Sequence, residues 1–167
     1  MVSRRSIQFL NVLVAIVMMQ VVGLADEPSL SVRRSKGDQF PRKVVVGTVI
    51  KGSHGEYPGL EQRLDELGKL VDRMADQAEK SGSKRGLDLV VLPETAVTSP
   101  HGTARERSVP LAGKVREAGA AIARKHRCYL VLPLDLVEEG KSGPITSNAA
   151  VLFARRGEVA GIYRKIH

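Results

Sequence analysis

Glu94 directly follows a very apolar run, residues 87–93, and is the first side chain with an evident chemical use. A carboxylate at the carboxyl end of a buried strand lies where α/β sheets bind ligands. Apolar neighbours would strip water from it, as a general base acting near neutrality requires. From its spacing alone, a role in ordering the following loop is slightly favoured.

Lys165 is the second such side chain, within the run Tyr163-Arg164-Lys165-Ile166-His167 at the far end of a β-branched segment. A lysine in that position could reach into a cleft and stabilise negative charge that develops on a substrate oxygen. Taken alone, a solvated cation at a strand end is the more common role for such a residue.

Apolar patterning predicts the elements that must position these two residues. Predicted strands span residues 43–50, 87–93, 129–137, 148–153 and 159–163. The first is almost continuously apolar, which indicates burial on both faces. Spacings of three and four predict amphipathic helices at 60–78 and 111–125. The last two strands flank a Gly-containing loop and predict a hairpin. Strands that alternate with helices indicate an α/β fold with a helix-covered sheet.

The first 25 residues have the zones of a secretory signal peptide. Arg4 and Arg5 form a positive start, an apolar stretch follows, and small residues end at Ala25, where we expect cleavage. A membrane anchor is disfavoured because the apolar stretch is shorter than roughly 20 residues and contains two amides. We therefore predict a signal peptide at 1–25, a flexible lead-in at 26–42, a domain at 43–167, and a secreted or periplasmic location, by general or twin-arginine export.

The net charge of +8 and the positions of the four histidines limit the other functions. The basic clusters are short and carry no interleaved aromatic residues, so a solvated surface is favoured over a nucleic-acid site. The four histidines lack metal-ligand spacing. His54 and His101 lie near serines but without an orienting acid, so they are expected to be surface loop residues.

Together, the motifs resemble the N-terminal portion of the carbon–nitrogen hydrolase (nitrilase) superfamily over residues 43–167. The resemblance is carried by Val-Val-Leu-Pro-Glu-Thr at 90–95, Asn-Ala-Ala-Val-Leu-Phe at 148–153 and Tyr-Arg-Lys-Ile-His at 163–167. It implies an incomplete α-β-β-α sandwich of the nitrilase type. It also implies that Glu94 is the general base and Lys165 the oxyanion stabiliser for a cysteine that attacks an amide or nitrile. No metal or organic cofactor is implied, and the partner is a small amide or nitrile.

The nucleophile itself is expected to be missing. In the family, the cysteine follows the lysine by some tens of residues, with a second glutamate between them, whereas this sequence ends two residues after Lys165. We therefore expect a chain truncated before its nucleophile and inactive alone. Cys128, the one cysteine, lies upstream between a helix end and an apolar strand, where a buried hydrophobe is expected.

Two other functions stay open. The first is a secreted non-catalytic module of the same fold that binds a small molecule or a protein. The second, ranked last, is a basic surface that binds anionic polymers. Half a sandwich would also leave apolar sheet faces uncovered, so we expect the isolated chain to be poorly soluble or homo-oligomeric, with no membrane attachment after signal removal.

Overall fold

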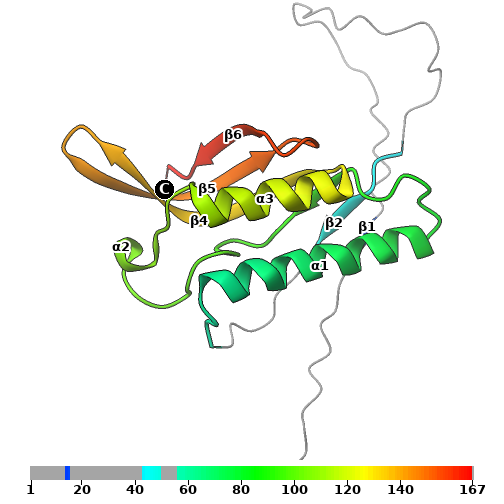
Figure 1. Cartoon of the computed structure of the whole chain (residues 1–167), viewed down its shortest axis with the longest axis horizontal. Helices are drawn as coiled ribbons and strands as arrows, with labels where there is room; N and C mark the ends of the chain where they lie inside the picture. Colours follow the sequence, from blue (N-terminus) through cyan, green and yellow to red (C-terminus); the bar gives the residue numbers. More distant parts are fainter. Residues whose placement is uncertain (1–13, 16–42, 50–55, 167) are drawn as a thin grey trace, which may run out of the picture.

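A computed structural model describes residues 14–15, 43–49 and 56–166, which form one mixed sheet and three helices (Figure 1). The strands are β1 (Val14–Ala15), β2 (Val46–Thr48), β3 (Leu89–Val91), β4 (Tyr129–Gly140), β5 (Gly143–Phe153) and β6 (Val159–Arg164). The helices are α1 (Leu60–Lys80), α2 (Ala104–Arg107) and α3 (Gly113–His126). In the sheet, the strands lie in sequence order.

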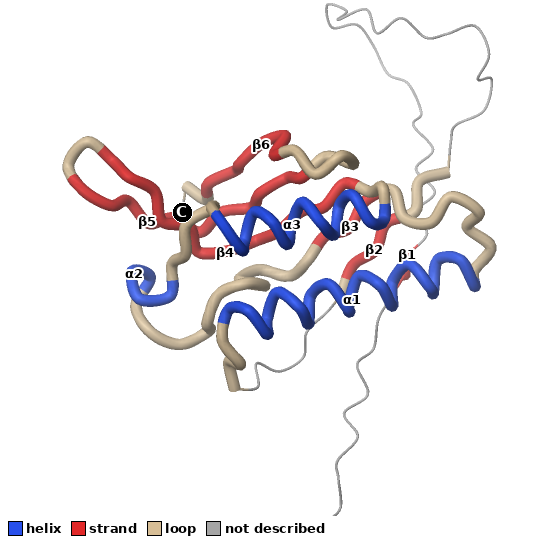
Figure 2. Tube along the Cα trace, in the orientation of Figure 1, coloured by secondary structure: helices blue, strands red, loops and turns tan. Residues whose placement is uncertain are grey.

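The long helices connect the parallel part of the sheet and lie on one side of it. Strands β2, β3 and β4 are parallel, with α1 and α3 as the two connections. Both connections join parallel strands, and such connections are almost always right-handed. Because both also move along the sheet in the same direction, their helices lie on the same face. Figure 2 shows α1 and α3 side by side in front of the strands. The chain then turns back twice, so that β4, β5 and β6 are antiparallel.

Both predicted helices are confirmed, and all five predicted strands are present with different lengths. Strands β2 and β3 are shorter than predicted. The β4–β5 hairpin is longer, because its pairing runs from Leu130↔Phe153 to Gly140↔Gly143. The part of the hairpin near its turn is mostly polar, so the sequence there lacks the alternation of apolar and polar residues that predicts a strand. The short α2 was not predicted, although Thr103 and Glu106 form the reciprocal capping box that marks its start.

Close backbone approaches identify the face that the helices cover. A Cβ atom added to Gly119 of α3 would lie 2.5 Å from the Phe153 ring, and one added to Gly47 of β2 would lie 3.1 Å from the Met74 sulfur in α1. Strand side chains alternate, so residues in register with Phe153 and Gly47 point the same way. These residues are all buried: Val90, Leu130, Leu132, Leu134, Leu136, Ala149 and Val151.

The opposite face, called the open sheet face below, is mostly apolar and only partly covered, and it also holds buried Asp135. It carries Val46, Leu89, Val91, Val131, Pro133, Ala150, Leu152 and Tyr163. All are half-buried except Tyr163, whose residue exposure is 64%. The prediction that residues 43–50 are buried on both faces is therefore wrong where the structure describes them: buried Gly47 lies between half-buried Val46 and Thr48.

Most of the predicted signal peptide and lead-in lies outside the described residues. The exception is β1, which pairs antiparallel with β2 through Val14↔Gly47 and Ala15↔Val46. Within the described part of the chain, no helix has the length and apolar character needed to cross a bilayer.

Candidate functional site

Glu94 and Lys165, separated by 71 positions in the sequence, lie side by side at the end of the sheet. Glu94 is in the turn after β3, and Lys165 immediately follows β6. Lys165 Nζ donates to Glu94 Oε1 at 3.3 Å. Both side chains are well exposed, with 53% of Lys165 and 63% of Glu94 accessible. The sheet thus brings together the two residues singled out in the sequence.

Lys165 is held in place by its backbone and by its neighbour. Its amide donates to the Asn148 carbonyl at 2.8 Å, which continues the β5–β6 pairing past the end of β6. Arg164 donates two charge-assisted hydrogen bonds, of 2.7 and 2.6 Å, to the carboxylate of Glu138 in β4. The hydrogen bonds from Arg164 hold the pKa of the Glu138 carboxyl below its ordinary value. The end of β6 is therefore held to β5 by its backbone and to β4 by the Arg164 side chain.

The loop that carries Glu94 is fixed by local turns and by one distant side chain. Thr95 adopts a left-handed backbone (φ 53°), and its hydroxyl donates to the Glu94 carbonyl at 2.7 Å. The Tyr57 hydroxyl donates to the Val97 carbonyl at 3.1 Å. Burial raises the pKa of the Tyr57 hydroxyl, which keeps it protonated as a donor. Thr98 is buried and points towards β4.

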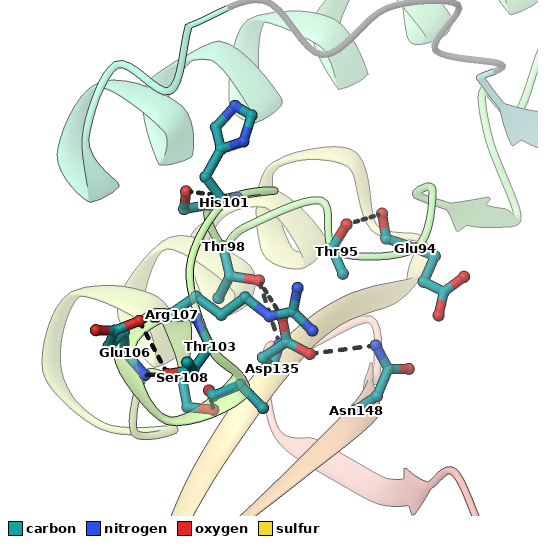
Figure 3. Close-up of polar contacts among 12 residues, drawn as sticks. Glu94, Thr95, Thr98, His101, Thr103, Glu106, Arg107, Ser108, Asp135 and Asn148 are labelled. Atoms are coloured by element: carbon teal, nitrogen blue, oxygen red, sulfur yellow. Dashed lines mark hydrogen bonds and ion pairs between the residues drawn. The ribbon is translucent and has the colours of Figure 1, made fainter. Parts of the chain in front are cut away.

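Asp135 of β4 connects the loop that carries Glu94 with the strand next to Lys165 (Figure 3). It is only 2% exposed. One carboxylate oxygen accepts from Thr98 Oγ1 at 3.1 Å and lies 2.9 Å from Arg107 Nε of α2. The other accepts from Asn148 Nδ2 at 3.3 Å. Thr98 belongs to the Glu94 loop, and Asn148 binds the Lys165 backbone, so one buried carboxylate connects both.

Sequence reasoning missed Asp135, although a signal was available. It is the one charged residue in the run Leu132-Pro133-Leu134-Asp135-Leu136. A charge in a buried strand is retained only when it is paired and hydrogen-bonded. Its partners come from 37 positions upstream and 13 downstream, at separations that no local pattern reveals.

The surroundings of Glu94 differ from the sequence-based expectation. We expected apolar neighbours to strip water from its carboxylate, but the side chain keeps 63% of its exposure. The loop after Glu94 and α2 cover Asp135 on the open sheet face, but they leave the Glu94 carboxylate itself accessible. Any water exclusion around Glu94 would have to come from a further wall.

The other candidate groups that the structure describes are not placed for catalysis. Cys128 is fully buried, and burial raises the pKa of its thiol to about 11, so it remains protonated at neutral pH. Ser99 Oγ accepts from the backbone N–H of exposed His101, and no hydrogen bond between a serine and the His101 imidazole is present among the described residues. His54 lies outside the described residues. Among the residues that are described, no group of His, Cys, Asp and Glu side chains could hold a metal ion.

Residues 57–167 match the family model described as "Carbon-nitrogen hydrolase". A "Nitrilase" of Pyrococcus abyssi is 35% identical over 98 residues, which are 56% of this chain and 36% of that protein. The chain therefore spans little more than a third of the length of this relative.

Two solved structures share the fold. A carbon–nitrogen hydrolase from Helicobacter pylori G27 aligns with a TM-score of 0.52 at 22% identity, over 74% of this chain and 40% of its own. Saccharomyces cerevisiae Nit3, a member of branch 10 of the nitrilase superfamily, aligns with a TM-score of 0.52 at 22% identity, over 68% and 41%. The chain thus has an α/β fold of the nitrilase type, and it covers less than half of either structure.

Proposed function

Because this chain belongs to the carbon–nitrogen hydrolase family, we propose that its site takes part in the hydrolysis of a non-peptide carbon–nitrogen bond in an amide or nitrile. The observation that carries the proposal is the 3.3 Å contact between Lys165 and Glu94 at the end of the sheet. Glu94 serves as the general base and Lys165 as the oxyanion stabiliser, and a cysteine from outside these 167 residues serves as the nucleophile.

For an amide, the proposed steps assign one task to each group. Glu94 takes the proton of the thiol, and the thiolate attacks the carbonyl carbon. The ammonium of Lys165 stabilises the negative oxygen of the tetrahedral intermediate. Glu94 returns the proton to the leaving nitrogen. The C–N bond then breaks, ammonia or an amine leaves, and the acyl group remains on the cysteine as a thioester. Water, deprotonated by Glu94, then attacks the thioester, and the acid and the thiol are released.

We also propose that these 167 residues have no hydrolase activity by themselves. Their one cysteine, Cys128, is buried and protonated, and it lies on β4's amino-terminal side, away from the Glu94 end of the sheet. The additional wall and the thiol would be supplied by further sequence or by another chain. The contact between Glu94 and Lys165 does not distinguish nitrile from amide substrates, because both need the same two groups.

The test is to express the complete open reading frame that encodes these residues and to assay it with a panel of amides and nitriles. If it encodes a further cysteine, we expect release of ammonia or amine, abolished by Glu94→Gln and by Lys165→Ala. Lys141→Ala, in the exposed β4–β5 turn, is the matched control and should retain activity. Full activity in either site variant would contradict the proposed roles.

A second candidate is a non-catalytic module that binds a small molecule or a protein. It is favoured by the high exposure of both site residues and by the partly covered apolar sheet face. If the reading frame encodes no further cysteine and the protein hydrolyses nothing in the panel, this second function replaces the first.

Export is part of the proposal for either function, because residues 1–25 have the zones of a signal peptide. The amino-terminal mass of the protein recovered from outside the cytoplasm tests it. An amino terminus at Asp26 is expected, and an intact Met1 in a cytoplasmic protein would contradict export.

A further inference from the structure

Four arginines line a shallow, solvent-open cavity of about 440 Å³ that lies far from the Glu94 end of the sheet. Arg124 and Arg127 come from the last turn and the C-cap of α3. Arg155 and Arg156 come from the turn between β5 and β6. The cavity is therefore built where a helix end meets a hairpin turn.

The turn is packed directly on the helix. A Cβ atom added to Gly157 would lie 2.6 Å from Arg124 Nη1 and 2.8 Å from the Ala120 carbonyl oxygen. Gly157 also has a φ of +85°, which favours glycine. The hairpin arginines are thus brought against the helix arginines by a contact that only a glycine allows.

One of the four guanidinium groups is already fixed. Arg155 Nη2 donates to Asp88 Oδ1 at 2.9 Å, and its guanidinium carbon lies 5.3 Å from the centre of the Tyr129 ring. Asp88 immediately precedes β3, and Tyr129 is the first residue of β4. Both therefore lie at the amino ends of these parallel strands, whereas Glu94 follows the carboxyl end of β3. These contacts place the cavity at the end of the sheet opposite to Glu94 and Lys165.

The other three arginines have no ion-pair partner among the residues that the structure describes. The four lining arginines and Asp88, the ion-pair partner of Arg155, together carry a formal charge of +3. Like charges held in one place repel each other, and a bound anion relieves that repulsion. Guanidinium groups bind the oxygens of phosphate in pairs, through parallel N–H donors.

We propose that this cavity, the arginine pocket, binds a multiply charged phosphate group such as that of a small polyphosphate. A carboxylate would neutralise only one of the three positive charges. Nucleic acid is disfavoured because no aromatic residue lines the cavity for base stacking, and the Tyr129 ring already packs against Arg155.

The test is titration of the full 167-residue chain with pyrophosphate by calorimetry, at physiological ionic strength, where diffuse attraction is screened. The pocket variant is Arg124→Gln with Arg156→Gln, which leaves the Arg155–Asp88 pair intact. The control is Arg105→Gln with Arg116→Gln, which removes the same charge from exposed arginines of α2 and α3. We expect binding to weaken at least about tenfold in the pocket variant and less than about twofold in the control.

A second arm identifies the source of the phosphate. Vesicles that contain phosphatidic acid are compared with free pyrophosphate, using the same pair of variants. Pocket-dependent binding to either probe supports the site, and the preferred probe names its source. Equal weakening in both variants would assign binding to diffuse surface charge and overturn the proposal. Absence of binding to both probes, or binding to duplex DNA alone, would overturn it as well.

Discussion

Asp135 and Asn148 face each other across β4 and β5, and the amide of Asn148 donates to the carboxylate at 3.3 Å. The backbone carbonyl of Asn148 in turn accepts from the Lys165 amide. Since Asp135 also accepts from Thr98 in the Glu94 loop, one buried carboxylate that touches neither Glu94 nor Lys165 connects the segments that carry them.

We predict that Asp135→Ala destabilises the fold by about 3 kcal/mol, because it leaves Arg107 without its ion-pair partner, and buried Thr98 and half-buried Asn148 without their acceptor. Urea unfolding measures the change. Asp65→Ala is the control, since Asp65 forms an exposed pair with Lys69 within α1 and should cost less than about 1 kcal/mol. Equal effects of the two changes would contradict a structural role for Asp135.

Two glycines in helices should respond to alanine in opposite directions. Gly119→Ala would force a methyl group within 2.5 Å of the Phe153 ring, and we expect a loss of about 1–3 kcal/mol. Gly68→Ala in α1 meets no atom within 4 Å and should stabilise by about 1 kcal/mol through helix propensity. Thermal unfolding of both variants measures the difference. Stabilisation by Gly119→Ala would mean that α3 does not pack so closely on β5.

Asp72 should make stability depend on acid pH. A hydrogen bond from Lys125 has the largest effect on the pKa of Asp72. Burial opposes it, a hydrogen bond from His126 reinforces it, and the pKa lies below its ordinary value of 3.8. The folded pKa is lowered, so this stabilisation is present above the unfolded pKa and is lost as pH falls through the folded one. Urea midpoints from pH about 2 to 6 should therefore converge for wild type and Asp72→Asn at the acid end. A constant gap would contradict the assignment.

Cys128 should be inert in the native protein. Its thiol is buried with a pKa of about 11, so a water-soluble disulfide reagent should modify it only after denaturant is added. Rapid modification of the native chain at neutral pH would show that the thiol is accessible. It would also reopen Cys128 as a candidate nucleophile.

The open sheet face should drive self-association of the isolated chain. Tyr163 is exposed among half-buried apolar neighbours, so Tyr163→Lys should shift the chain towards the monomer. Ser142→Lys adds the same charge in the exposed β4–β5 turn and should have no such effect. Light scattering after gel filtration measures the mass. A monomer in the wild-type chain would contradict the prediction.

The sequence by itself determined the two long helices, the strands of the sheet, and the motifs around Glu94 and Lys165. Apolar periodicity records which side of each element packs, and neighbours two to four positions apart carry that information. The same local pattern misjudged β2, because apolar residues on both sides do not reveal whether a second layer is present.

Only the tertiary structure decided how the site is assembled. The approach of Lys165 to Glu94 follows from strand order and register, which bring residues 71 positions apart to one edge. The role of Asp135 and the gathering of four arginines against Gly157 depend on the same long-range pairing. No local pattern fixes such pairing, because register is set by the packing of the whole sheet against its helices.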